Sequence, residues 1–244
     1  MKESIPRPSE NSWQGENNFA LFKSSVPISD EQIWIAFYHL HKSKVQVQKE
    51  KVAVEKLKKI VLATFKLVNE KGFTLMSLRD LSRETEMSMG SLYAYIGSKG
   101  QLAEMIHQFL PHIFDLCILD HLTESDSVEL QMKKLIRGHI FITECLQAWF
   151  FFAYMETKHL SESTKQLAKN NEVRSENWFK QILKSGQASG NFIKTDRFLT
   201  AMSIKSLLQN WYVKRGKYRQ ANVTCEAYIE FIEQMINQLI RAKA

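Results

Sequence analysis

The stretch that decides the fold is residues 77–99, SLRDLSRETEMSMGSLYAYIGSK. Ser77, Ser88 and Ser98 each precede a short run that favours helix, and a serine hydroxyl at such a position accepts a hydrogen bond from a free helix amide. The pattern predicts two helices of about two turns joined by a tight turn, and then a longer helix that begins at Lys99. Two short helices joined in this way have the geometry of a helix-turn-helix.

The segment before this stretch supplies the third helix that such a domain needs. Val61, Phe65 and Val68 recur at helical spacing, and Gly72 stands where the end of a helix favours a left-handed residue. The apolar residues of the two short helices are expected to pack on this stripe. We therefore predict a helix-turn-helix domain over residues 46–98.

Composition indicates a helical, globular chain of the reducing cytoplasm. Of 244 residues 44% are hydrophobic, and only 9 are Gly and 4 are Pro, so helix breakers are scarce. The three cysteines have no disulfide or metal-site spacing, which predicts a cytoplasmic protein without a metal. The longest apolar run, 148–155, is far shorter than the ~20 residues of a membrane span, so none is expected.

Positive charge is concentrated in one part of the chain. The net charge is +7, and residues 42–99 hold 12 Lys and Arg against 6 Asp and Glu. Such a field suits DNA or an anionic membrane surface. An ordinary solvated helix surface can have the same composition, so charge alone does not choose among these.

The flanking segments complete an all-α chain. Residues 1–27 contain three of the four prolines and no helical period, which predicts a disordered tail. Ile33, Phe37 and Leu40 predict an extra helix over residues 28–45. Residues 99–244 are expected to form a larger helical domain.

The quoted stretch resembles the DNA-binding domain of the TetR family. The resemblance is carried by Gly72, residues 77–82, residues 87–95 and the pair Ser98-Lys99. It implies a homodimer that binds a palindromic operator in double-stranded DNA and represses transcription until a small ligand releases it. Residues 99–244 would then be the ligand-binding and dimerisation domain.

The same resemblance implies which residues contact DNA. Ser88, Met89 and Ser91 would face the bases, Tyr93, Tyr95 and Lys99 would bind phosphates, and Ser77 and Arg79 would lie close to the backbone. Gly90 and Ala94 are small and uncharged, and Gly90 allows close approach to base edges. Taken singly, these serines could be only helix caps, the tyrosines packing residues and Lys99 a surface lysine.

One departure from the family pattern falls at the turn. Glu86 stands where the family often has glycine. A left-handed backbone at a residue other than glycine costs about 1 kcal/mol. The sequence therefore predicts mild strain at Glu86.

The second half of the chain resembles, less specifically, the TetR-type regulators of fatty acid metabolism that sense acyl-CoA. The resemblance implies a small hydrophobic effector, such as an acyl-CoA, in an apolar pocket. The candidate ligand-binding residues are Trp149, Phe152, Met155, Glu156, Trp178, Trp211 and Arg215. Aromatic residues at helical spacing are also what a plain core contains.

Two other function classes remain open on the residues alone. One is an all-helical small-molecule binding protein, and the other is a membrane-surface module without sequence-specific DNA binding. The chain has no serine-triad order, glycine-rich phosphate loop or HExxH motif, so neither an enzyme nor a cofactor is predicted.

Overall fold

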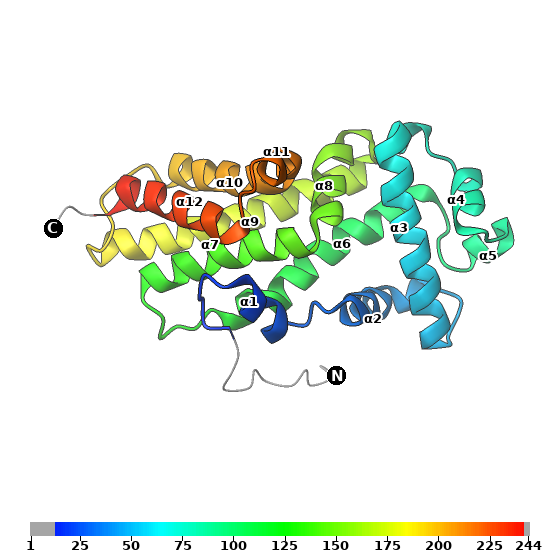
Figure 1. The fold of residues 1–244 in the computed structure, drawn as a ribbon, viewed down its shortest axis with the longest axis horizontal. Helices are drawn as coiled ribbons and strands as arrows, with labels where there is room; N and C mark the ends of the chain where they lie inside the picture. Colours follow the sequence, from blue (N-terminus) through cyan, green and yellow to red (C-terminus); the bar gives the residue numbers. More distant parts are fainter. Residues whose placement is uncertain (1–12, 242–244) are drawn as a thin grey trace. The chain divides into compact units, whose positions relative to one another are not determined.

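The computed structural model describes residues 13–241 of the chain. The regular elements of the described part are all helices, apart from an isolated antiparallel bridge between Phe192 and Arg241, and the all-α prediction is confirmed. The α-helices, labelled in Figure 1, are α1 (Phe19–Ser25), α2 (Asp30–His41), α3 (Glu50–Leu75), α4 (Leu78–Thr85), α5 (Met89–Tyr93), α6 (Lys99–Cys117), α7 (Val128–Cys145), α8 (Gln147–Glu156), α9 (Glu162–Ala188), α10 (Arg197–Val213), α11 (Arg215–Gln220) and α12 (Cys225–Ile240). Three 3-10 turns occupy Lys42–Lys44, Leu119–His121 and Thr157–His159.

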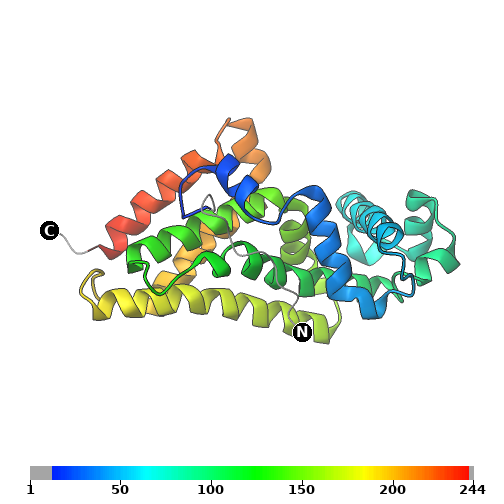
Figure 2. The ribbon, with the colours of Figure 1, turned by 90° about the horizontal axis from the view of Figure 1, so that it is seen from below.

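The helices form two compact units, and two of the boundaries between these units lie inside α6 and α9. The helix-turn-helix unit comprises residues 30–113 and 146–174, and the bundle unit comprises the described residues up to 29, 114–145 and those from 175 on. Helix α9, which belongs to both, is one continuous helix in Figure 2. The grouping differs from the predicted division at residue 99, because parts of α6, α8 and α9 pack with the helix-turn-helix.

The helix-turn-helix unit has an aromatic core around Trp149 of α8. The ring of Trp149 lies 5.1 Å from that of Phe109, 5.3 Å from those of Phe37 and Phe65, and 5.2 Å from that of Trp34. These partners come from α6, α2 and α3. The extra helix predicted over residues 28–45 is therefore part of this core, as helix α2 and the following 3-10 turn.

The prediction of a disordered tail is wrong for residues 13–27, whereas residues 1–12 lie outside the described part. Trp13 and Phe22 are fully buried in the bundle unit, with ring centroids 5.0 Å apart. The Arg137 guanidinium donates to the Gly15 carbonyl at 2.5 Å, and the Asn17 amide donates to the Glu226 carbonyl at 3.1 Å. The segment is ordered by partners far along the chain, which its own composition does not reveal.

Within the described residues, the stretch Lys99–His121 is long and apolar enough to span a membrane by length and composition. However, 61% of its apolar window is buried inside the protein. Core helices of soluble proteins pass the same test, so the stretch is weak evidence for a membrane span.

Candidate nucleic-acid interface

Helix α4 begins at a reciprocal cap between Ser77 and Asp80. The Ser77 hydroxyl accepts the Asp80 amide at 3.2 Å, and the Asp80 carboxylate accepts the Ser77 amide at 2.9 Å. Hydrogen bonds from the Ser77 hydroxyl and amide, and then from Lys71 and Arg83, hold the pKa of Asp80 well below its usual value. The cap fixes the start of α4, while Ser77 and Arg79 stay exposed.

The turn between α4 and α5 has the left-handed residue that the sequence predicted. Glu86 has φ 53° and ψ 30°. The turn is closed on both sides, because the Met87 amide donates to the Ser82 carbonyl at 3.1 Å and the Ser82 hydroxyl donates to the Met87 carbonyl at 2.6 Å. Met87 is buried, which anchors the turn to the core of the unit.

Helix α5 is short and presents small, uncharged side chains. Its cap is Ser88, whose hydroxyl accepts the Ser91 amide at 3.1 Å, and its anchor is the fully buried Leu92. Ser88 and Gly90 are exposed, and 48% of Tyr93 is accessible to solvent. Met89, Ser91 and Ala94 are half-buried. All six remain candidates for DNA contact.

Tyr95 is a correction to the predicted contacts. Its side chain is buried, with 4% exposed, and burial raises the pKa of its phenol. Helix α5 ends at Tyr93, and the Tyr95 amide bonds to the Leu92 carbonyl at 2.9 Å in a tighter turn. The spacing that would place Tyr95 beside Ser91 on one helix face no longer applies there, so Tyr95 packs inward.

Lys99 also has a different role from the predicted phosphate contact. Its ammonium donates to the carbonyls of Phe73, Thr74 and Met76 at 3.0, 2.9 and 2.9 Å, and it lies 5.0 Å from the centre of the Phe73 ring. An ammonium has three protons, and each has an acceptor here. Lys99 thus satisfies the free carbonyls at the end of α3.

The predicted ligand-binding residues are divided between the two units, with Trp149, Phe152, Met155 and Glu156 in the helix-turn-helix unit and Trp178, Trp211 and Arg215 in the bundle unit. Trp149 and Phe152 belong to the aromatic core of the helix-turn-helix unit, where the Glu156 carboxylate accepts the Phe73 amide at 3.3 Å. Met155, on the same helix, is 41% exposed. The aromatic neighbours fill the space around Trp149, so Trp149, Phe152 and Glu156 have structural contacts in this conformation, and a ligand contact at Met155 stays a prediction.

Trp211 and Arg215 belong to a separate cluster in the bundle unit. The Arg215 guanidinium holds the Glu144 carboxylate with two hydrogen bonds of 2.6 and 2.8 Å, and it lies 4.5 Å from the Trp211 ring. The indole of Trp211 donates to the same carboxylate at 3.1 Å. Arg215 therefore already has an anionic partner within the protein.

Trp178 is connected through Phe114 to two buried basic residues, His139 and Lys205, that the sequence did not indicate. Its ring stacks on Phe114 at 4.8 Å, and Phe114 in turn contacts the His139 ring at 5.7 Å. His139 and Lys205 are both buried, and the pKa of His139 lies well below its usual value because of burial and then the nearby Lys205 charge. The two residues lie on different helices, α7 and α10, so spacing along the chain gave no signal that they are close. Among the described residues no cluster of His, Cys, Asp or Glu could hold a metal ion.

Comparison with known proteins decides the family. Residues 60–106 match the family model of bacterial regulatory proteins of the tetR family, and residues 125–236 match the tetracyclin repressor-like C-terminal domain. The chain belongs to the TetR family of transcriptional regulators. The TetR helix-turn-helix model spans most of α3 through the first part of α6, and so contains the turn at Glu86.

Similar proteins agree with this assignment. The HTH-type transcriptional regulator HbdR of Aromatoleum sp. (strain CIB) is 22% identical over 207 residues, which are 79% of this chain and 84% of HbdR. AibR, solved in complex with isovaleryl coenzyme A and operator DNA, has a TM-score of 0.64 at 16% identity and covers 74% of this chain and 97% of its own. FadR from Bacillus subtilis, in complex with stearoyl-CoA, has a TM-score of 0.60 at 13% identity, over 73% and 96%. At such identities the structures show a shared fold.

Proposed function

We propose that this TetR-family protein is a homodimeric repressor that binds a palindromic operator and is released by an acyl-CoA. The observation that carries the proposal is the left-handed turn at Glu86, which leaves Ser88 and Gly90 exposed at the start of α5. In a helix-turn-helix the start of the second helix meets base edges in the major groove. Helix α5 contains no carboxylate that would repel DNA.

The DNA-contact roles divide by chemistry. Ser88, Met89 and Ser91 read bases, and Gly90 lets the backbone come close. Ser77, Arg79 and Tyr93 bind phosphates and set the register, as hydroxyl and guanidinium groups do in other complexes. Ala94 lies at the end of the same surface. Tyr95 and Lys99 act only through the scaffold.

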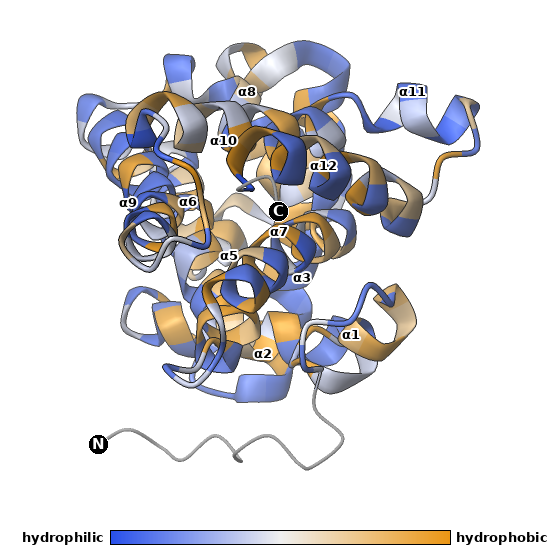
Figure 3. Cartoon of the chain, turned by 90° about the vertical axis from the view of Figure 1, so that its left-hand side faces the viewer, coloured by the Kyte–Doolittle hydropathy of each residue, from blue (hydrophilic) through white to orange (hydrophobic). Residues whose placement is uncertain are grey.

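A second copy of the chain is the proposed occupant of an apolar surface on α10 and α12. Phe231, Met235 and Leu239 follow one face of α12 at four-residue spacing and are 43–58% exposed. Phe198 and Leu199 at the start of α10 are 56% and 62% exposed. Figure 3 shows hydrophobic segments along both helices. A two-fold dimer through this surface would match the symmetry of a palindromic site.

The effector proposal is supported by the ligands of AibR and FadR and by His139 and Lys205, two buried basic residues of the bundle unit. Isovaleryl-CoA and stearoyl-CoA both join an acyl chain to an anionic group. We place the effector against Trp178 and Phe114, with Lys205 as the partner of its negative charge. A buried ammonium gains most from an added anion, because water screens it least.

The decisive experiment is a mobility-shift assay on the DNA upstream of the gene that encodes this protein. A Cβ on Gly90 would meet no protein atom within 4 Å, so Gly90→Ala should fold normally yet obstruct the approach to bases. We expect its affinity for the fragment to be lower by about tenfold or more. Gly216→Ala, where a Cβ likewise meets nothing, is the matched control and should bind as wild type does.

Adding isovaleryl-CoA or stearoyl-CoA should release the DNA, and Lys205→Met should need more of either compound. Release by neither acyl-CoA would reject the effector. If the wild-type protein bound anionic vesicles and no DNA, the function would be that of a membrane-surface module. If it bound acyl-CoA but no DNA, it would be a small-molecule binding protein.

A further inference from the structure

Most positive charges of α3, α4 and α5 are already neutralised within the helix-turn-helix unit. The ion pairs are Lys58–Asp30, Lys59–Glu86, Lys66–Glu84, Lys71–Asp80 and Arg83–Asp80. Lys99 is held by backbone carbonyls. From the second turn of α3 to the end of α5, only Lys56 and Arg79 have side chains without such a partner among residues 13–241. The helix-turn-helix itself thus offers few free cations to a DNA backbone.

Other lysines, in the segment that leads into α3 and in the first turn of that helix, are not neutralised in this way. Lys42, Lys49 and Lys51 are exposed, and their side chains make no ion pair or hydrogen bond with any residue that the structure describes. Glu50, the acidic residue between the last two, lies 3.2 Å from His39. We call residues 42–51 the basic segment.

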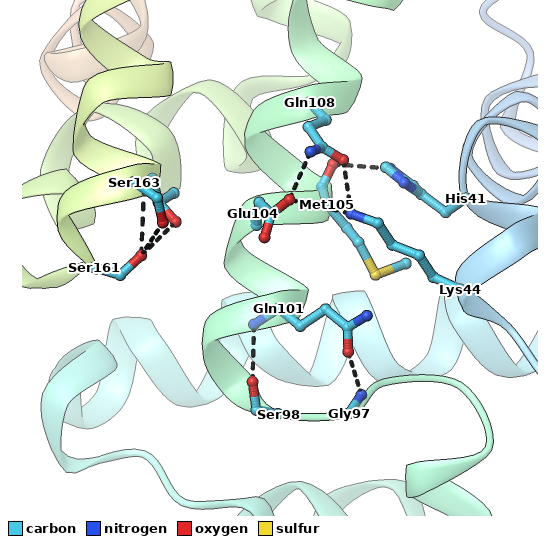
Figure 4. A network of polar contacts seen from close by, with 11 residues as sticks. His41, Lys44, Gly97, Ser98, Gln101, Glu104, Met105, Gln108, Ser161 and Ser163 are labelled. Atoms are coloured by element: carbon cyan, nitrogen blue, oxygen red, sulfur yellow. Dashed lines mark hydrogen bonds and ion pairs between the residues drawn. The ribbon is translucent and has the colours of Figure 1, made fainter.

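The backbone of the basic segment is held in place although these lysines are free. Figure 4 shows the contacts that attach it and the end of α2 to α6. The His41 ring bonds to the Met105 carbonyl at 3.0 Å, and the Lys44 ammonium reaches Glu104 at 3.2 Å and Gln108 at 3.1 Å. Val45 is buried. A fixed backbone lowers the entropic cost of using the free lysines to bind a ligand.

The basic segment also contacts the end of α5. The Gln46 amide donates to the Ala94 carbonyl at 2.9 Å, one residue beyond the exposed Tyr93. When a short helix lies in a major groove, the sugar-phosphate strands that border the groove pass beside its ends. The free lysines are therefore anchored next to the place where a phosphate strand would run.

Helix stability does not account for these charges. Lys49 is the N-cap of α3 and Lys51 is in its first turn. Cations at a helix N-terminus are unfavourable, because the amide ends of the helix are positive. Two lysines at such a position cost the fold something and gain no partner within the described chain, so a ligand outside the chain is the better explanation.

We propose that the basic segment is a second DNA contact, in which Lys42, Lys49 and Lys51 bind phosphates of the duplex beside the bases read by α5. This inference rests on the proposed function and extends its interface beyond the helix-turn-helix. It assigns much of the salt-dependent part of the affinity to residues that precede the family-matched region, which begins at residue 60.

The test measures affinity against salt concentration for the wild type and for the triple variant Lys42→Gln, Lys49→Gln, Lys51→Gln. The probes are the fragment upstream of the protein's own gene and an unrelated duplex of equal length. The slope of log affinity against log salt is negative, and each lost phosphate contact makes it shallower by about 0.9. We expect the slope of the triple variant to be shallower by about 2 or more. Its affinity for both probes should fall at least tenfold, with the preference between the two probes kept.

The matched control replaces three exposed lysines elsewhere, Lys169, Lys194 and Lys217, whose side chains also lack partners in residues 13–241. It removes the same net charge, so it corrects for the general field of the protein. Thermal unfolding should show the triple variant to be as stable as the wild type, or slightly more stable, since the charges leave a helix N-terminus.

An unchanged slope, or a loss equal to that of the control, would overturn the inference while leaving the proposed function intact. If the wild type bound neither duplex, both proposals would be rejected together. Loss of binding to phosphatidylglycerol vesicles, with the DNA slope kept, would assign the lysines to a lipid surface and also overturn the inference.

Discussion

The turn region of the helix-turn-helix and the N-terminal segment of the bundle unit are ordered in opposite ways. Between residues 77 and 91 the deciding hydrogen bonds join residues three to five positions apart, as in the Ser77–Asp80, Ser82–Met87 and Ser88–Ser91 contacts. The N-terminal segment relies on distant partners. Asn17 and Glu226 are 209 positions apart, and Gly15 and Arg137 are 122 apart.

This difference explains why one region could be read from the sequence and the other could not. A cap or tight turn depends on residue types within a window of a few positions, so its pattern is visible in the chain. A buried tryptophan in a proline-containing, polar stretch has its partners elsewhere. The composition of such a segment therefore does not show whether it packs against the rest of the protein.

The largest expected effect concerns that N-terminal segment. Trp13→Ala should lower the free energy of unfolding by about 3–5 kcal/mol, because it removes a fully buried ring that packs on Phe22 and Phe141. Chemical denaturation would measure it. Lys23→Ala, an exposed change on α1, should cost little. Equal small effects would mean that the segment does not dock in solution, and the contrast between the two regions would disappear.

Lys99 is a residue of the helix-turn-helix unit that has distant partners, 23–26 positions away along the chain. Lys99→Met should cost about 1–2 kcal/mol of stability, because it leaves carbonyls at the end of α3 without a donor. It should leave the salt slope of DNA binding unchanged. If the variant had normal stability and a slope shallower by about 0.9, Lys99 would be a phosphate contact, as the sequence resemblance implies.

The sequence predicted the helix-turn-helix well, whereas its predictions for the rest of the chain were only partly correct. The caps at Ser77 and Ser88 were predicted from residue types in short windows, the left-handed Glu86 from the family pattern at that position, and the all-α class from the scarcity of Gly and Pro. Tyr95 was misplaced because helix α5 ends two residues earlier than its face would need. For Trp149 and Trp211, aromatic spacing indicated burial but not the neighbours that fill the space around each ring, so their ligand-binding role stays a prediction.

A smaller effect separates the two tyrosines near the end of α5. Tyr93→Phe removes an exposed hydroxyl from the proposed phosphate contact and should weaken DNA binding by about 0.5–1.5 kcal/mol. Tyr95→Phe changes a buried ring and should alter DNA affinity by less than about 0.5 kcal/mol. Binding isotherms at one salt concentration suffice. A larger loss for Tyr95→Phe would mean that α5 extends further when DNA is bound.

The smallest effect is a gain, and it isolates the strain at the turn. Glu86→Gly keeps the left-handed backbone without the Cβ clash and should stabilise the protein by about 0.5–1 kcal/mol. The exposed Lys59–Glu86 pair, at 3.4 Å, is lost at little cost because water screens it. Asn222 also has φ 53°, but asparagine tolerates this region, so Asn222→Gly should gain less. Thermal unfolding of the two variants compares them directly. If both variants gained equal stability, the left-handed backbone would cost no more at Glu86 than at an asparagine. The predicted strain at Glu86 would then be absent.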